Sequence, residues 1–293
     1  MAYTYLIHGL LLSVPFACDE LIAAPDGALP DIVAKEGEVP RTLASPYVSE
    51  PSFDAADGAF LFRGGMRSAR FLVQNGTQIT FSKNRECQDD LFFHHLLYPV
   101  MAAVLRQRRL LPLHASGASN ATGAVLLTGD SGAGKSTTIS QMVSQGWSLQ
   151  ADDLCALQLT QNGELGVLPG TDRVHLCEEA LARLPYQTAC LPRRDWHRNK
   201  APLALVSERK WQPIFRIVHL RLTGSPHLQV KKITGQGKLS VLFASLYGPA
   251  LPTELRASSS ILLRSLKDIE MVAISRPRGK WSMNEVLEHV IGP

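Results

Sequence analysis

The 293-residue chain has few cysteines, little net charge and no long apolar run, and each shortage excludes a class of protein. Its five cysteines are scattered and include no C-x-x-C pair, which argues against a disulfide framework and against a structural zinc site. A net charge of +4 does not by itself indicate nucleic-acid binding, although it suits an anionic ligand such as a nucleotide. Since no apolar stretch reaches the length that spans a bilayer, we expect no membrane partner.

The first twenty residues contain an apolar core that Tyr5, His8 and Ser13 interrupt, and no basic residue precedes this core. Secretory signal peptides begin with such a basic region, so the partial alternation favours a first strand over Tyr3–Val14. Together with the lack of a disulfide pattern, this predicts a cytoplasmic protein. Hydrophobic residues make up 45% of the chain and charged residues 19%, a composition typical of globular proteins.

Residues 1–87 predict a small β-rich N-terminal domain. Short strands are expected at 59–62, 69–73 and 77–81. Gly-Gly and Asn-Gly dipeptides separate these stretches, and Asn-Gly between apolar runs is a strong hairpin signal.

Residues 88–293 predict the larger domain, and the expected fold class of the chain is α/β. A helix is predicted over 88–110, interrupted by Pro99, because Asp residues stand at its start and Arg residues at its end. Strands and helices then follow to a last helix over 283–291, for which Ser282 predicts a capping box.

Residues 129–136 read GDSGAGKS, a complete G-x-x-x-x-G-K-[ST] phosphate-binding motif. The apolar run 124–128 before it predicts a buried strand, and apolar residues recur at helical spacing after it. In that context the backbone N–H groups of the loop and the helix N-terminus would bind phosphate oxygens. The residues expected to contact a nucleotide are Gly129, Asp130, Ser131, Gly132, Ala133, Gly134, Lys135, Ser136 and Thr137.

Two residues of the motif and two that follow it carry the chemistry. Lys135 would be a point charge for the β- and γ-phosphates, and the Ser136 hydroxyl suits a Mg²⁺ ligand. Residues 147–151 predict a strand beside the first one, and this strand ends in Asp152 and Asp153. A carboxylate there can bind Mg²⁺ or take a proton from an attacking hydroxyl, and two adjacent carboxylates allow both. The expected cofactors are ATP and Mg²⁺.

Three more side chains are candidates for the site. His114 could hydrogen-bond an active-site carboxylate if its flanking segments pair as a hairpin, or it could be structural. Arg173 could bind a phosphate or a substrate carboxylate, or it could be a surface charge. Lys200 lies in a basic run over 190–212 that carries no nucleic-acid motif. The run favours a loop over the nucleotide, and the alternative is a plain solvated loop.

The order of these motifs resembles the catalytic domain of HPr kinase/phosphorylase. The matching features are His114 before a glycine-bearing turn, the loop G-D-S-G-x-G-K-S, a helix ending in Gly146 and the sequence L-x-x-D-D ending at Asp153. A weaker match covers 169–176, where such homologues carry P-G-x-x-R-x-x-L. The chain also resembles the shorter HPr-kinase-like proteins of peptide-modification clusters, including lasso-peptide kinases.

The resemblance implies a P-loop kinase domain of the HPr-kinase/PEP-carboxykinase-like type, acting on a serine hydroxyl with ATP. It implies Asp152 as the base that deprotonates the hydroxyl and His114 as its assistant. Lys135 would bind the phosphates, and a cation near Lys200 would approach them. Ser136 and Asp153 would bind Mg²⁺.

The resemblance also bears on the acceptor. Thr137 stands where HPr kinases carry an acidic residue, and residues 165–170 replace their E-I-R-G signature. The implied acceptor is therefore a serine-containing peptide or protein, such as the C-terminal serine of a lasso precursor peptide. The alternatives are a kinase for a small hydroxylated metabolite and a non-catalytic nucleotide-binding regulatory protein. No nucleic-acid partner is expected, and a homo-oligomer is compatible with the sequence.

Overall fold

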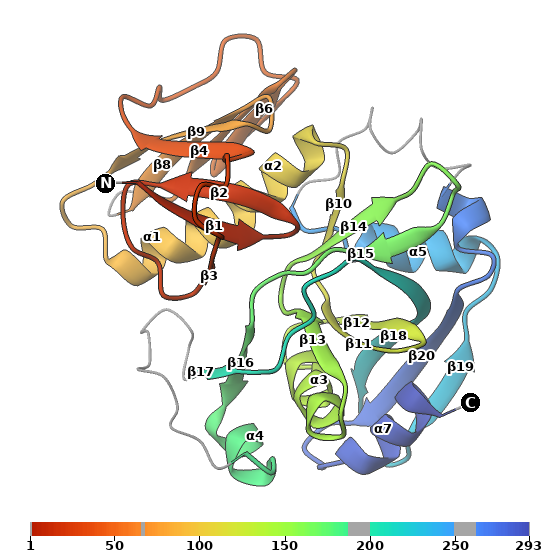
Figure 1. Ribbon diagram of the computed structural model, residues 1–293. Helices are drawn as coiled ribbons and strands as arrows, with labels where there is room; N and C mark the ends of the chain where they lie inside the picture. Colours follow the sequence, from red (N-terminus) through yellow and green to blue (C-terminus); the bar gives the residue numbers. More distant parts are fainter. Residues whose placement is uncertain (1, 66–67, 187–199, 249–261, 293) are drawn as a thin grey trace. The chain divides into compact units, whose positions relative to one another are not determined.

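The computed structural model describes residues 2–65, 68–186, 200–248 and 262–292. The chain divides into two compact units between Leu111 and Pro112. Each unit combines a sheet with helices, so the described chain is an α/β protein (Figure 1). None of the helices in the described ranges combines the length and the apolar character that crossing a membrane requires.

The first unit is built on a nine-stranded sheet in the order β3-β1-β2-β4-β9-β8-β7-β6-β5. Its strands are β1 Tyr3–Ile7, β2 Leu10–Val14, β3 Ile22–Ala23, β4 Ile32–Glu36, β5 Val48–Glu50, β6 Phe53–Ala56, β7 Ala59–Arg63, β8 Ala69–Gln74 and β9 Gln78–Lys83. Neighbours pair antiparallel except that β4 runs parallel to β2 and to β9. The three strands expected near residues 59–81 are present as β7, β8 and β9.

The predicted single strand over Tyr3–Val14 is two strands. β1 and β2 form a hairpin in which Ile7 lies opposite Leu10. The turn residues His8 and Gly9 have φ values of 51° and 70°, the left-handed conformation that tight hairpin turns require. A His-Gly pair inside an apolar run is a weaker turn signal than Asn-Gly, so the pattern alone did not reveal the turn.

The helical segment after β9 belongs to the first unit, whereas the sequence placed the domain boundary at 87/88. It comprises α1 Asp89–His95, a π-helical turn Leu96–Val100 that contains Pro99, and α2 Met101–Gln107. The ring of Phe92 lies 5.2 Å from that of Phe71 on β8 and 5.1 Å from that of Phe81 on β9. These aromatic contacts bury the helix against the first sheet, and the division therefore falls at 111/112.

The second unit contains the predicted phosphate loop. Its elements are β10 Leu111–Leu113, β11 Ser116–Asn120, β12 Gly123–Gly129, α3 Lys135–Ser144, β13 Ser148–Ala151, β14 Cys155–Leu159, β15 Leu165–Val167, β16 Arg173–Cys177, α4 Glu178–Arg183, β17 Lys200–Ala204, β18 Gln212–Thr223, β19 Gln229–Lys232, α5 Gln236–Ala244, β20 Glu270–Pro277 and α7 Met283–Ile291. One sheet has the order β10-β14-β15-β18-β12-β11-β13, with β20 beside β18 and β19 beside β20. β16 and β17 form a separate two-stranded sheet.

Parallel strands lie at the centre of this unit. β12 and β20 both run parallel to β18, so their carboxyl ends meet at one edge of the sheet. β13 was expected beside β12, but β11 lies between them and pairs antiparallel with both. Strand β11 thus lies between β12 and β13. The sequence did not predict it, because residues Ser116 to Asn120 are small and polar.

The core of the second unit lies between this sheet and helices α3 and α7. Ile139 and Met142 of α3 and Val286 and Val290 of α7 belong to one buried cluster with residues of β12, β18 and β20. The last helix has the predicted bounds, but Ser282 makes no side-chain cap hydrogen bond, so the predicted capping box is wrong. Of the loop expected over 190–212, residues 190–199 lie outside the described residues, and Lys200–Ala204 forms strand β17 instead of a loop.

Candidate functional site

The glycine-rich loop connects β12 to α3, and its shape depends on glycines with positive φ. Gly132 and Gly134 have φ values of 81° and 102°, which residues with a Cβ rarely adopt. At Gly129 a Cβ would lie 2.0 Å from the carbonyl oxygen of Leu220, so only glycine lets β12 end this close to β18. The predicted order of strand, loop and helix is confirmed.

The N-terminus of α3 presents unpaired donors. The first N–H that bonds back into the helix is that of Thr138, which donates to Gly134 O at 2.9 Å. The N–H groups of Lys135, Ser136 and Thr137 precede that bond and lie at the positive end of the helix dipole. This end of α3 therefore offers an anion site.

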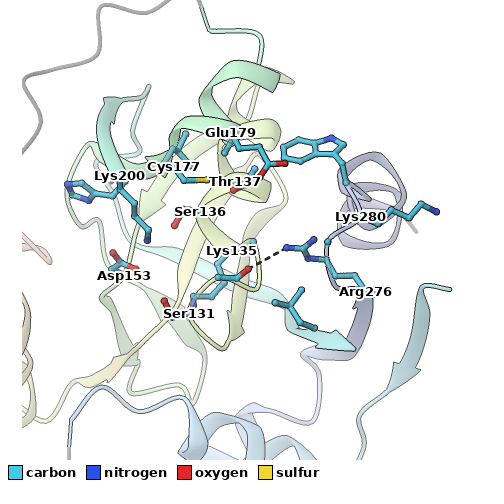
Figure 2. A pocket seen from close by; sticks show the side chains of 18 of the residues that line it. Ser131, Lys135, Ser136, Thr137, Asp153, Cys177, Glu179, Lys200, Arg276 and Lys280 are labelled. Carbon is cyan, nitrogen blue, oxygen red and sulfur yellow. Dashed lines mark hydrogen bonds between the residues drawn. The ribbon is translucent and has the colours of Figure 1, made fainter. Parts of the chain in front are cut away.

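A pocket of about 320 Å³ lies over this helix end (Figure 2). It is lined by His114, Ser131, Gly132, Gly134, Lys135, Ser136, Thr137, Asp153, His175, Leu176, Cys177, Glu179, Ala180, Lys200, Leu222, Arg276, Gly279, Lys280 and Trp281. Most of the predicted site residues are thus brought together. Among the described residues, the lining does not include the predicted Gly129, Asp130, Ala133, Asp152 and Arg173.

Lys135 is buried under the loop and lies against carbonyl oxygens. Its Nζ donates to Gly129 O at 2.8 Å and to Asp130 O at 3.2 Å, and it lies 3.2 Å from His114 Nε2. Burial lowers the pKa of Lys135, and the nearby carboxylates of Asp153 and Asp152 oppose that shift. The ammonium therefore sits in the loop and faces the space that a phosphate would fill.

Asp152 lies behind the pocket wall and is almost fully buried. Its Oδ1 accepts hydrogen bonds from Ser116 Oγ at 2.5 Å and from Ser136 Oγ at 2.9 Å, and its Oδ2 accepts one from the His175 N–H at 3.3 Å. Burial, and then the charge of Asp153, raise the pKa of Asp152 to about 6, although the hydrogen bonds oppose the shift. The result is a carboxylate that can gain or lose a proton near neutral pH.

Asp153 lies in the pocket wall with a left-handed backbone, at φ 60°. Donor atoms of Asp152, Asp153 and His175 all lie within 4.8 Å of one another, a spacing that fits one divalent cation with modest adjustment. Carboxylate oxygens and the adjacent Ser136 hydroxyl are donors that Mg²⁺ accepts. The residues present therefore fit the cation that the sequence predicted.

His114 does not contact a carboxylate as predicted. Lys135 can only donate, so it makes His114 Nε2 an acceptor and leaves the proton on Nδ1, which donates to the Asp153 carbonyl at 3.2 Å. Burial and the charge of Lys135 lower the pKa of His114, which favours this neutral form. His114 thus links Lys135 to the backbone of Asp153.

The two remaining predicted cations differ in placement. Lys200 starts β17 and lines the pocket on the same side as Asp153 (Figure 2). Arg173 starts β16, and its Nε lies 3.4 Å from the carboxylate of its neighbour Asp172. The structure thus brings Lys200 to the pocket and pairs Arg173 locally.

Three residues of the site were missed. Ser116 and His175 contact Asp152, as described above. Arg276, at the end of β20, donates from Nε to Ala133 O at 2.8 Å and contacts Gly132 O at 3.4 Å (Figure 2). The available signal was positional: a cation at the carboxyl end of a strand parallel to the loop's neighbour lies where such sheets bind ligands.

No family model matches the chain, and no curated protein matches it. Among solved structures, the chain is similar to the Hpr(Ser) kinase/phosphatase from Coxiella burnetii, with a TM-score of 0.29 and 12% sequence identity. That match covers 61% of this chain and 93% of the other. The function proposed below rests on the geometry of the site and on the sequence motifs.

Proposed function

We propose that the chain is an ATP-dependent kinase that transfers the γ-phosphoryl group to a serine hydroxyl. The observation that carries the proposal is Asp152, a buried carboxylate hydrogen-bonded to Ser136 of the phosphate loop, with a pKa raised to about 6. A base whose pKa lies near the working pH is the group that proton transfer from a hydroxyl needs. The second unit would then be a P-loop kinase domain of the HPr-kinase/PEP-carboxykinase-like type.

The phosphates of ATP fit the N-terminus of α3. The N–H groups of Lys135, Ser136 and Thr137 would donate to phosphate oxygens, and the Lys135 ammonium would lie against the β- and γ-phosphates. Arg276 and Lys200 add positive charge to the walls of the same pocket. These groups hold the transferring phosphoryl group in place and stabilise its charge.

Ser136 and Asp153 would hold Mg²⁺ in this site. When bound, the cation neutralises charge on the transferring phosphoryl group. His114 holds Asp153 in place because it donates to the Asp153 carbonyl, and its contact with Lys135 fixes the neutral ring. It acts as a positioning residue.

In the reaction, the acceptor oxygen forms a bond to the γ-phosphorus, and the bond from that phosphorus to the β,γ-bridging oxygen breaks. ADP leaves, and the hydroxyl proton passes to Asp152, whose Oδ2 accepts only the longest of its three hydrogen bonds, from the His175 N–H at 3.3 Å. Bringing the acceptor, the phosphoryl group and the base together accounts for most of the acceleration in such transfers.

The nature of the acceptor rests on the sequence resemblance. We propose a serine of a peptide or protein, with the C-terminal serine of a lasso precursor peptide as the specific substrate. Two alternatives remain: the acceptor is a small hydroxylated metabolite, or the protein binds nucleotide without transferring a phosphoryl group. The following experiment separates both from the peptide acceptor.

The test incubates the full chain with ATP, Mg²⁺ and a peptide that ends in serine, and follows the peptide by mass spectrometry. We expect a mass gain of one phosphoryl group on the terminal serine. Asp152→Asn should lower the rate by roughly 100-fold or more, because the base is lost. Its affinity for ADP, measured by calorimetry, should stay within a few-fold of the parent value.

Two controls sharpen the result. A peptide that ends in alanine should gain no mass at its terminus. Transfer to glycerol or free serine, with no transfer to the peptide, would replace the peptide acceptor with a small metabolite. Tight ADP binding without transfer to any hydroxyl would refute the kinase proposal.

A further inference from the structure

His175 belongs to the site, and neither the motif nor the proposed roles above use its side chain. It lies in the middle of β16, a segment separate from the loop and from the Asp152-Asp153 pair. One ring nitrogen of His175 and one carboxylate oxygen from each aspartate lie within 4.8 Å of one another.

The strand fixes the direction of this side chain. Val174 and Leu176 belong to the buried apolar cluster of the second unit. Because side chains alternate across a strand, His175 faces the opposite way, and it lines the pocket while remaining only 4% exposed. Its own N–H donates to Asp152 Oδ2, so the backbone is anchored to the carboxylate pair.

His114 is the other histidine in the pocket, but it is poorly suited to bind a cation. Its Nε2 faces the Lys135 ammonium and its Nδ1 faces the Asp153 carbonyl. Both ring nitrogens are thus engaged, and one of them lies against a positive charge. A cation that binds Asp153 would therefore find its nitrogen ligand on β16.

We propose that His175 supplies a nitrogen ligand to the divalent cation that Asp153 holds with a carboxylate oxygen, while Asp152 keeps its role as the base. The inference rests on the proposed function only in placing a cation at this pocket. Imidazole nitrogen binds Mn²⁺ and Co²⁺ more readily than Mg²⁺, which prefers oxygen donors. The site should therefore select a first-row transition metal over Mg²⁺ at equal concentration.

The test uses Mn²⁺ alone as the probe, with the full chain and no nucleotide, so that it does not depend on kinase activity. Electron spin echo envelope modulation of bound Mn²⁺ should show a directly coordinated ¹⁴N nucleus. Protein labelled with ¹⁵N-histidine should convert that signal to the ¹⁵N pattern. This measurement needs no variant and therefore stands even if a substitution disturbs folding.

Variants then assign the nitrogen. His175→Asn should abolish the nitrogen signal and weaken Mn²⁺ binding roughly tenfold or more. His114→Asn and the exposed His289→Asn should keep the signal. Mg²⁺ should displace Mn²⁺ from the parent protein only in large excess, and at a much smaller excess from His175→Asn.

Two results would overturn the inference: bound Mn²⁺ without nitrogen coordination, and a nitrogen signal that survives His175→Asn. Failure to bind Mn²⁺ at millimolar concentration would also overturn it. A nitrogen-coordinated ion together with no phosphoryl transfer would retain this site and remove the kinase. Transfer without a nitrogen signal would do the reverse.

Discussion

Each unit of the molecule buries a carboxylate, and the surroundings shift the pKa values of the two in opposite directions. Asp54 in the first unit accepts hydrogen bonds from Arg63 at 2.8 Å, from Ser49 at 2.7 Å and from the Leu43 N–H at 2.9 Å. These bonds, led by that of Arg63, hold the pKa of Asp54 well below its usual range. Asp152 in the second unit lies beside Asp153 and has its pKa raised to about 6 by burial and by that second negative charge.

The opposite pKa shifts indicate different roles: Asp54 stabilises the fold, whereas Asp152 suits proton transfer or cation binding. A carboxylate paired with a guanidinium is fixed in its charged state and ties distant segments together. A carboxylate buried beside a second one is held in a state that a proton or a cation relieves. The first unit therefore uses its buried charge for structure, whereas the second keeps an unneutralised negative group under a phosphate loop.

The largest predicted effect comes from removing each carboxylate in turn. Asp54→Asn should destabilise the first unit by roughly 2–3 kcal/mol, because Arg63 loses its charged partner. Asp152→Asn should leave the unfolding free energy unchanged or slightly higher, because a disfavoured buried charge is removed. It should nevertheless abolish most of the transfer activity. Urea denaturation and the peptide transfer assay measure the two quantities.

The contrast between Asp54 and Asp152 is wrong if their asparagine variants change stability and transfer in the same way. Equal destabilisation by both would show that Asp152 is also a structural carboxylate. Loss of transfer in Asp54→Asn, at a temperature where its first unit remains folded, would show that the paired carboxylate has a part in the chemistry.

A second prediction concerns the buried histidines of the first unit, His8 and His95. Burial lowers the pKa of each to about 4, whereas the unfolded chain titrates near 6.5. Between these values the unfolded state binds more protons, so stability is complete above pH 6.5 and falls as the pH drops to about 4. The loss should be on the order of 2–3 kcal/mol for each ring. Hydrogen exchange of peptides from the first unit, measured from pH 7 to pH 4.5, follows it.

His8→Asn is the variant that tests this assignment. Asparagine tolerates the positive φ of His8, 51°, and cannot gain a charge in this range. The pH dependence of the first unit should therefore become shallower. His289→Asn, at an exposed site on α7, should leave it unchanged. An undiminished pH dependence in His8→Asn would assign the effect to other groups.

The sequence predicted the second unit's loop better than its surroundings. The glycine spacing of residues 129–136 and the following apolar periodicity determined a strand, a turn and a helix, because backbone sterics leave few alternatives. The insertion of β11 between β12 and β13 was not predictable, since strand order depends on long-range pairing. Ser116, His175 and Arg276 were missed for the same reason: each reaches the site from an element that the fold alone brings near.

For the first unit, the prediction and the structure differ mainly in where the unit ends: the sequence placed the helical segment in the second domain, and the structure places it in the first unit. The acidic start and basic end of residues 88–110, with the interruption at Pro99, were sufficient to predict the helical segment. Which sheet the helix packs against depends on Phe71, Phe81 and Phe92 meeting in space, and no local pattern records that. Local signals thus gave the elements, and tertiary contacts decided their assignment to a unit.

The smallest predicted effect compares two arginines that hold backbone carbonyls. Arg63 donates to Pro51 O and Arg41 O in addition to Asp54. Arg276 donates to Ala133 O in the phosphate loop. Replacing either by lysine keeps the positive charge but removes the planar fork of donors, so the carbonyls are held less firmly.

Arg63→Lys should therefore lower the unfolding free energy of the first unit by about 1 kcal/mol, with ADP binding unchanged. Arg276→Lys should instead weaken ADP binding by roughly 5- to 10-fold, because the loop is less preorganised for phosphate. Arg278→Lys, two residues further along and exposed, is the matched control and should change neither quantity. Calorimetry of ADP binding beside urea denaturation separates these outcomes. If Arg276→Lys lowered stability and left ADP affinity intact, the Arg276 guanidinium would have a structural role like that of Arg63. The contrast between a structural first unit and a ligand-binding second unit would then depend only on Asp54 and Asp152.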